Sequence, residues 1–255
     1  MLNCSRRFVQ SVSDSIATRL SRALRISDYK APIPPTAVVT PDLPQATEME
    51  KKGNRLDKFL SGVASMFNEE KYSDTTVLIH GVTLHAHRLI ICLQSPYFTK
   101  ALKEAFVEGS TGAIEFQEGS GIAHWRVFEY LYTGNYSDSL SNKDFEEDPE
   151  LCKDLRVYVL ADMFFLEDLK ALALEKFKRN LEDLWMSDSF PECVREVYKS
   201  TYERDHALRS VVVEVAATHA HDLGSNGIFK DLVYEGGDFV VDYFEKLLYI
   251  MEPNE

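Results

Sequence analysis

The sequence predicts an α+β fold that is mainly helical, with a small three-stranded sheet and a C-terminal helical extension. Apolar residues recur at helical spacing over most of the chain from residue 55 onward, whereas strand-like runs are short and confined to 75–79, 82–86 and 114–116. The composition agrees, because 45% of the 255 residues are hydrophobic and 11% are aromatic, enough for a substantial core.

The first 54 residues are predicted to form a flexible tail and a proline-rich linker. Residues 1–27 hold five arginines and one acid, and apolar residues recur at every fourth position, which is typical of a basic amphipathic helix. Two interpretations fit this segment: a mitochondrial presequence or membrane-surface helix, and a tail that becomes ordered only on contact. The five prolines between Pro32 and Pro44 then preclude a regular helix and indicate an extended linker.

Folded structure is expected to begin near Leu56 with a short helix that carries one apolar stripe and ends before the polar run 68–71. The residues of this stripe are Leu56, Phe59, Leu60, Val63 and Phe67. A β-hairpin follows: residues 75–79 are β-branched and apolar, His80-Gly81 supplies a turn, and residues 82–86 return as a second strand.

Two helices are predicted after the hairpin. The first runs from Arg88 to Leu93, and the second follows Ser95-Pro96, with serine as the N-cap and proline at the first helical position, and continues through Phe106. A short half-buried strand at 114–116 and a helix over 122–132 come next. Thr133-Gly134 ends that helix.

An acidic segment, residues 137–150, separates this region from two more amphipathic helices. A break at Glu167-Asp168 divides the two, which are expected to form a helical hairpin. The extension beyond residue 184 is predicted to hold three helices, punctuated by glycines. Their ranges are 191–202, 208–221 and 238–250.

Several short motifs accompany this order of elements. They are Tyr72-Ser73-Asp74, His87-Arg88, Ser95-Pro96-Tyr97-Phe98, Phe106-Val107-Glu108, FEYLYTG at 128–134 and VYVLAD at 157–162. Together with the element order over residues 55–183, they resemble the BTB/POZ family, and the chain is similar to the short BTB-domain proteins of filamentous fungi. The resemblance implies a tail and linker at 1–54, a BTB/POZ domain at 55–183 and a helical extension at 184–255.

The resemblance implies a non-enzymatic adaptor that binds other proteins. One interpretation is a substrate adaptor of a cullin 3-type ubiquitin ligase, in which Phe106 enters a groove of the cullin and the Glu108 carboxylate anchors beside it. Phe106 also continues the apolar stripe of Phe98 and Leu102, so packing in the core is the alternative role. The second interpretation is a homodimeric scaffold in transcriptional or signalling complexes, without a ligase.

The resemblance also implies a homodimer, in which the first helix packs against its counterpart through the stripe that begins at Leu56. It further implies a charged pocket at the dimer groove, formed by Asp74 and Arg88. The structural alternative is that Asp74 caps a local turn and that His87 satisfies buried backbone groups.

No catalytic, cofactor or metal site is predicted. The four cysteines are far apart, and the sequence holds no nucleophile with a base, no metal-binding spacing and no phosphate-binding loop. The net charge of -13 argues against direct binding of nucleic acid. Because no apolar stretch approaches roughly 20 residues, we expect a soluble protein of the cytoplasm or nucleus, with the basic N-terminus leaving mitochondria as an alternative.

Overall fold

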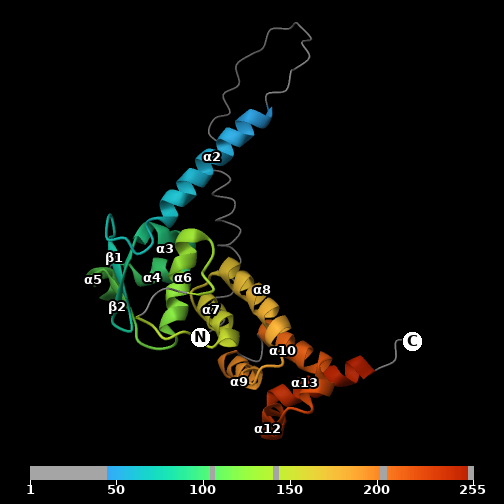
Figure 1. The fold of residues 1–255 in the computed structure, drawn as a ribbon. Coiled ribbons are helices and arrows are strands. Elements are labelled where there is room, and N and C mark those ends of the chain that lie inside the picture. The colour runs from blue at the N-terminus through green and yellow to red at the C-terminus, as the bar shows by residue number, and fades with distance from the viewer. Residues whose placement is uncertain (1–44, 104–106, 140–143, 202–205, 252–255) are drawn as a thin grey trace, which may run out of the picture. The chain divides into compact units, whose positions relative to one another are not determined.

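The computed structural model describes residues 45–103, 107–139, 144–201 and 206–251 and, within these, the side chains from residue 55 onward except that of Val107 (Figure 1). The chain divides into two units, Met1–Glu48 and Met49–Glu255, and the elements below belong to the second, apart from the first four residues of α2. Helix α2 (Gln45–Ala64) leads into it. This helix begins well before Leu56, where the sequence predicted folded structure to start, because the last linker proline is Pro44 and helix-forming residues follow it.

Three short strands form the predicted sheet, in the order β2-β1-β3. Strand β1 (Thr75–Ile79) pairs antiparallel with β2 (Val82–Ala86) and parallel with β3 (Ala113–Phe116). The turn residues His80 and Gly81 both have positive φ, 48° and 83°, as a two-residue type I′ hairpin requires. Alternate side chains of β1 and β2 are buried, so one face of the hairpin covers the core.

The helices that follow the hairpin are α3 (Arg88–Gln94), α4 (Pro96–Ala101), α5 (Val107–Thr111) and α6 (Gly121–Thr133). The Ser95 hydroxyl accepts the Phe98 N–H (3.3 Å), so it caps α4 as predicted. Helix α4 ends at Ala101 and does not continue to Phe106, which lies outside the described residues. The sequence did not predict α5, a single short turn without amphipathic spacing.

Helices α7 (Glu150–Met163) and α8 (Glu167–Leu184) pack against each other as the predicted helical hairpin. Between them the chain turns through Phe165, a non-glycine residue with a φ of 57°. The Leu166 N–H donates to the Ala161 carbonyl (2.8 Å) and the Phe165 N–H to the Asp162 carbonyl (3.1 Å). This is the Schellman pattern of helix ends, in which glycine usually occupies the position of Phe165.

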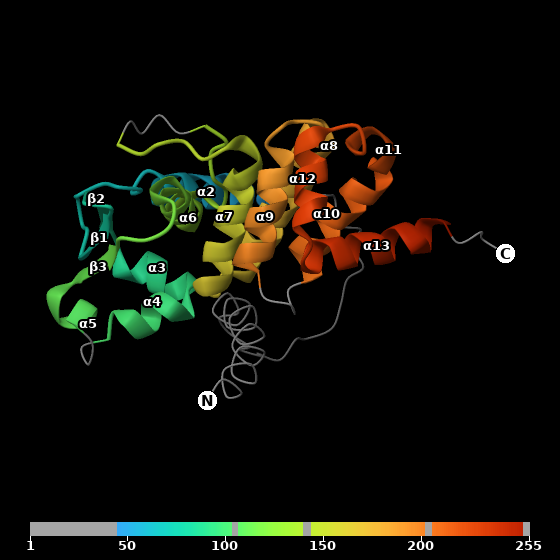
Figure 2. The same ribbon diagram turned by 90° about the horizontal axis from the view of Figure 1, so that it is seen from below.

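The extension holds five described helices rather than the predicted three (Figure 2). They are α9 (Phe190–Ser200), α10 (His206–Thr218), α11 (Ala220–Leu223), α12 (Gly227–Glu235) and α13 (Asp238–Met251). The prediction missed α12 because glycines flank it. Asn226 starts this helix by accepting the N–H groups of Ile228 (2.8 Å) and Phe229 (3.1 Å).

One hydrophobic core runs from the sheet into the extension. It includes Val77 on β1, Phe128 on α6, Phe177 on α8, Val194 on α9 and Phe239 on α13. Helix α9 packs on α7, and α10 packs on α8, so the extension is joined to the preceding helical hairpin through apolar side chains. No helix in the described part of the chain is long and apolar enough to span a bilayer.

Candidate functional site

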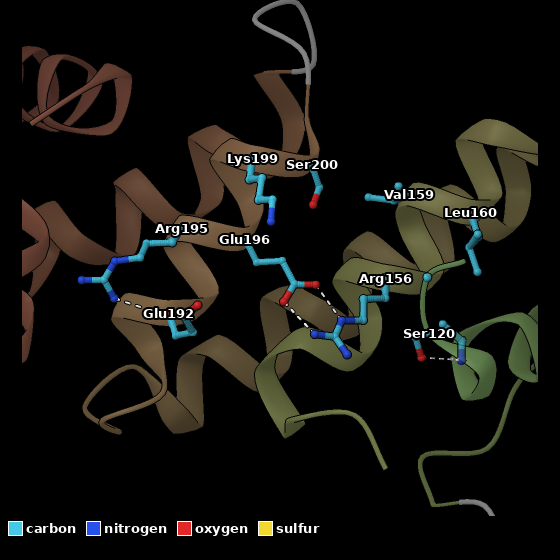
Figure 3. Close-up of a pocket in the computed structure, with 11 residues that line it drawn as sticks. Ser120, Arg156, Val159, Leu160, Glu192, Arg195, Glu196, Lys199 and Ser200 are labelled. Atoms are coloured by element: carbon cyan, nitrogen blue, oxygen red, sulfur yellow. Dashed lines mark hydrogen bonds and ion pairs between the residues drawn. The ribbon is translucent and has the colours of Figure 1, made fainter. Parts of the chain in front are cut away.

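A groove of about 690 Å³ lies between the start of α6, helix α7 and helix α9 (Figure 3). Its α6 and α7 side presents the apolar residues Ala123, Val159 and Leu160. Its α9 side is charged. Residues Glu192, Arg195, Glu196 and Lys199 line that side. A groove with one apolar and one charged side suits a segment of another protein, because the apolar side can bury apolar side chains of that segment and the charged side can fix its orientation.

Arg156 crosses the groove from α7 and ties it to α9 (Figure 3). Its Nε and Nη2 atoms donate to the two carboxylate oxygens of Glu196, at 2.6 and 2.9 Å, and its Nη1 atom donates to Asp148 at 2.5 Å. The hydrogen bonds to Glu196 raise the pKa of the guanidinium. Burial is the largest single influence on Glu196 and opposes its ionisation, but the hydrogen bonds and charge of Arg156, with smaller contributions from Cys152 and Lys199, together lower the pKa of this carboxyl.

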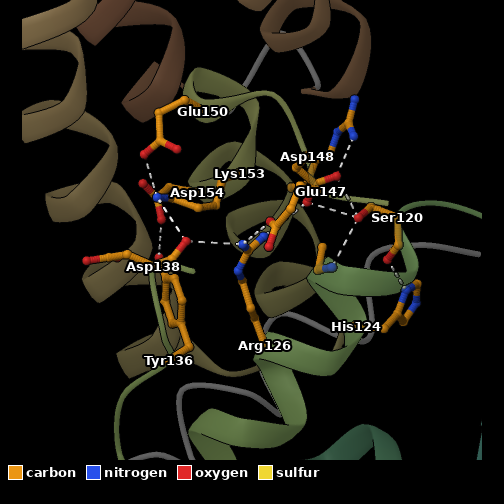
Figure 4. A network of polar contacts seen from close by, with 12 residues as sticks. Ser120, His124, Arg126, Tyr136, Asp138, Glu147, Asp148, Glu150, Lys153 and Asp154 are labelled. Atoms are coloured by element: carbon orange, nitrogen blue, oxygen red, sulfur yellow. Dashed lines mark hydrogen bonds and ion pairs between the residues drawn. The ribbon is translucent and has the colours of Figure 1, made fainter. Parts of the chain in front are cut away.

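The acidic segment is anchored by a polar network around Arg126, a residue of α6 that is fully buried (Figure 4). Arg126 donates to Asp148 (3.3 Å), to Glu147 (3.1 Å) and to the carbonyl of Ser137 (3.3 Å). The Ser120 hydroxyl donates to Asp148 at 2.8 Å. Asp148 therefore links α6 with Arg156 of α7, and the buried guanidinium is compensated by its carboxylate neighbours.

Sequence reasoning missed this network. Arg126 stands within an apolar helical run, where an unpaired charge would be strongly destabilising, and carboxylates follow it in the acidic segment. A charged residue within an apolar helix, followed by carboxylates in the next segment, was therefore the sequence signal for a buried ion pair. The Arg156–Glu196 pair joins residues far apart in the sequence and gave no such local signal.

Asp74 and Arg88, which were predicted to form a charged pocket, contact each other through two hydrogen bonds, each between a side chain and a backbone group. The Asp74 carboxylate accepts the backbone N–H of Arg88 at 2.7 Å, and the Arg88 Nε donates to the Asp74 backbone carbonyl at 3.2 Å. Arg88 is the first residue of α3, and Asp74 directly precedes β1 in the sequence. The Asp74 carboxylate therefore accepts an N–H group at the N-terminus of α3 and caps this helix. The structural alternative predicted that Asp74 caps a local turn; the group that it caps is instead the start of α3.

His87 lies buried beside this cap and satisfies polar groups, as that alternative stated. Its backbone N–H donates to the Tyr132 hydroxyl (2.8 Å), and its ring nitrogens lie 2.9 Å from the same hydroxyl and 3.2 Å from the Lys71 carbonyl. A carbonyl only accepts, so Nε2 carries the proton and Nδ1 accepts from Tyr132. Burial raises the pKa of Tyr132 to about 12.

The predicted docking motif is described only in part. Phe106 lies outside the described residues, and Glu108 is half-buried in the first turn of α5. Burial raises the pKa of Tyr97 on α4, and the nearby Glu108 carboxylate raises it further. The Tyr97 ring contacts Phe164 at 4.9 Å between centroids. Tyr97 therefore contacts the α7–α8 turn and lies within electrostatic range of Glu108.

Phe165, in that turn, is an exposed aromatic residue in a strained backbone conformation. Its φ is 57° and its exposed fraction is 42%. A left-handed non-glycine residue costs on the order of 1 kcal/mol, and such strain concentrates at functional positions. Nothing in the sequence pattern distinguished Phe165, because the strain depends on how α7 ends.

The stripe predicted for dimerisation divides into two parts. Leu56, Phe59 and Leu60 are each more than half exposed on α2. Val63 is half-buried, and Phe67 packs against Trp125 with ring centroids 5.3 Å apart. The first part of the stripe is therefore available to a partner, whereas Phe67 belongs to the fold.

The described residues contain no group of three or more His, Cys, Asp or Glu side chains placed to hold a metal ion. The chemistry that the arrangement offers lies in apolar contact and charged hydrogen bonds at its surface. These are the interactions by which protein segments recognise one another.

Comparison with known proteins finds a matching family model and several similar proteins. The family model described as the BTB/POZ domain matches residues 63–181. Human Kelch-like protein 30 is 26% identical over 83 residues, which are 32% of this chain and 14% of that protein. Mouse TD and POZ domain-containing protein 2 is 20% identical over 185 residues, 72% of this chain and 46% of that protein. The chain thus spans less than half the length of either curated relative.

Among solved structures, the BTB (Tramtrack and Bric a brac) domain of human gigaxonin matches with a TM-score of 0.35 and 21% identity. The match covers 55% of this chain and 98% of the gigaxonin chain.

Proposed function

Because residues 63–181 form a BTB/POZ domain, we propose that this protein is a non-enzymatic adaptor that brings other proteins together. BTB/POZ domains are generally interaction modules without catalytic activity. The observation that carries the proposal is the groove between α7 and α9, which combines apolar Val159 and Leu160 with the charged side of α9. It lies where the matched domain meets the extension, so both contribute to binding.

The more specific proposal is that the adaptor serves a cullin 3-type ubiquitin ligase. Its support is the neighbourhood of the predicted motif: the Glu108 charge is close enough to Tyr97 to raise its pKa, and Tyr97 contacts Phe164 in the turn that presents Phe165. A cullin that bound the Phe106 side chain in its groove would also contact Glu108 and the exposed ring of Phe165 in the α7–α8 turn. Aromatic residues at such positions often dominate binding energy.

Phe165 gives this proposal a sharp test. We expect Phe165→Gly to weaken binding of the cullin 3 N-terminal domain about tenfold or more, measured by calorimetry, because the variant removes an exposed anchor. The free energy of unfolding should stay within about 1 kcal/mol of wild type, since relief of the left-handed backbone offsets the greater freedom of glycine in the unfolded chain.

Tyr72 provides a matched control, because it is also an exposed aromatic residue with positive φ, 66°, at 77% exposure. Tyr72→Gly should leave cullin binding unchanged. A double variant, Phe106→Ala with Glu108→Ala, tests the motif itself. Full affinity of both Phe165→Gly and the double variant, with the fold intact, would exclude docking through this surface. Absence of cullin binding by the wild-type chain would exclude the cullin proposal and leave the general adaptor role in place.

The second candidate is a homodimeric scaffold, and the exposed part of the α2 stripe favours it. Leu56, Phe59 and Leu60 lie on one face of a helix, and large apolar side chains that are grouped and exposed mark interaction surfaces. An isologous contact would use the same face of both chains.

Phe59→Asp is expected to weaken this self-association about tenfold or more, because it places a carboxylate in a face that must be desolvated. Sedimentation equilibrium over a range of protein concentrations measures the change. Lys58→Asp, an exposed charged neighbour on the same helix, serves as the control. Equal association of wild type and Phe59→Asp would show that α2 is not the contact.

A further inference from the structure

Helix α9 presents two charged residues to the groove that neighbouring side chains do not fully compensate. Lys199 is exposed, lines the groove and enters no hydrogen bond or ion pair with another residue of the described ranges. Glu192 is 71% exposed and accepts from Arg195 at 3.1 Å, through one of its two carboxylate oxygens. Glu196, between them, differs because both of its oxygens accept from Arg156.

Arg195 does not compensate Glu192 fully, since most of its hydrogen bonds go elsewhere. Its Nε and Nη2 atoms donate to the two carboxylate oxygens of Glu235, at the end of α12, at 2.9 and 2.6 Å. The guanidinium points away from α7 (Figure 3). One oxygen of Glu192 and the ammonium group of Lys199 thus remain available to groups that enter the groove.

The spacing of these two charges sets the length of a matching segment. Glu192 and Lys199 are seven residues apart, close to two helical turns, so they share one face of α9 and lie about 10 Å apart along its axis. The groove volume of about 690 Å³ over that length gives a mean cross-section of about 70 Å². A helix of 10–12 Å diameter needs about 80–110 Å², whereas an extended chain is narrower.

We propose that the occupant of the groove is an extended segment of another protein with a basic residue opposite Glu192 and an acidic residue opposite Lys199. At about 3.3 Å per residue, these two positions are three residues apart, and an apolar side chain between them packs on Val159 and Leu160. The proposal rests on the binding role proposed above for the groove. Because the chain carries a net charge of -13, a segment with acidic residues alone would be repelled, whereas a base and an acid together are not.

The two charges also fix the direction in which the segment lies along α9. A segment in the reverse direction would place its base against Lys199 and its acid against Glu192, and such like-charge contacts disfavour the wrong arrangement. Lys199 and Glu192 therefore determine specificity, and the apolar wall of Val159 and Leu160 supplies burial.

The test selects random phage-displayed peptides on the full chain and discards those that still bind Leu160→Asp, a variant with a damaged apolar wall. The remaining peptides should be enriched in a base and an acid three residues apart with an apolar residue between them. For a selected peptide, Lys199→Glu should weaken binding about tenfold or more in calorimetry. Replacing the acid of the peptide by lysine should restore its affinity for Lys199→Glu, a rescue that a purely structural role of Lys199 would not give.

Lys230→Glu is the matched control, because Lys230 is an exposed lysine of the extension that lies outside the groove lining, and peptide binding should stay unchanged. Circular dichroism checks that each variant retains its helices. Peptides that depend on Leu160 but lack the charge pair, full affinity of Lys199→Glu, or failure of the rescue would each overturn this proposal and leave the groove as a binding site. If no selected peptide depends on Leu160, the binding role of the groove is overturned as well.

Discussion

At the scale of single residues, Arg156 connects the two sides of the proposed binding site. It lines the groove on α7, meets Glu196 of α9 with two hydrogen bonds and meets Asp148 with a third. The position of α9 against α7 therefore depends in part on the ionisation of Glu196. Since the pKa of Glu196 is lowered in the folded chain, its pairing stabilises the fold above the usual glutamate pKa and is lost as the pH falls through the folded value.

Glu196→Gln should lower the free energy of unfolding at pH 7 by about 1–2 kcal/mol, because Arg156 loses one of its two charged partners. The difference from wild type should shrink as the pH falls below the usual glutamate pKa, where the unfolded chain takes up the proton, and should vanish once the pH is below the lowered pKa of the folded chain. Urea unfolding at several pH values measures both effects. Glu192→Gln is the control, since Glu192 lines the same groove but is more exposed; a constant difference at every pH would refute the assigned role of Glu196.

At the scale of elements, the helix ends show what local sequence can and cannot predict. Ser95 as a cap and His80-Gly81 as a turn were identified correctly, because their chemistry acts within three residues. Helix α12 was missed, since its flanking glycines resemble a loop, although Asn226 is a cap of the same kind as Ser95. The Arg156 pairing could not be predicted, because it depends on how α7 and α9 pack.

Asn226→Ala is expected to destabilise the protein by about 1 kcal/mol, because two N–H groups at the start of α12 lose their acceptor. Helix α12 places Phe229 and Leu232 in the core, so the loss should appear in global unfolding by urea. Asn226→Asp keeps an acceptor and should remain near wild type. Equal stability of the alanine variant would mean that the cap contributes little to α12.

At the scale of the whole molecule, the extension and the matched domain share one core, and the groove lies across their junction. The sequence predicted the fold class and the three strands from periodicity, β-branched runs and short motifs, and the structure confirms both. It predicted Phe106 and Glu108 from a motif, and that part of the site stays a prediction. It could not predict the groove, because Ser120, Arg156 and Lys199 come together only through packing.

The parallel pairing of β1 with β3 also has a consequence for the order in which the chain folds. The β1–β2 hairpin closes over two residues, an event of about 1–10 μs in isolated hairpins. Strand β3 can join β1 only after the intervening segment, which contains α3 and α4, has compacted, and closing that longer loop costs additional chain entropy. The hairpin can therefore form early, whereas the third strand depends on prior collapse of the helices between them.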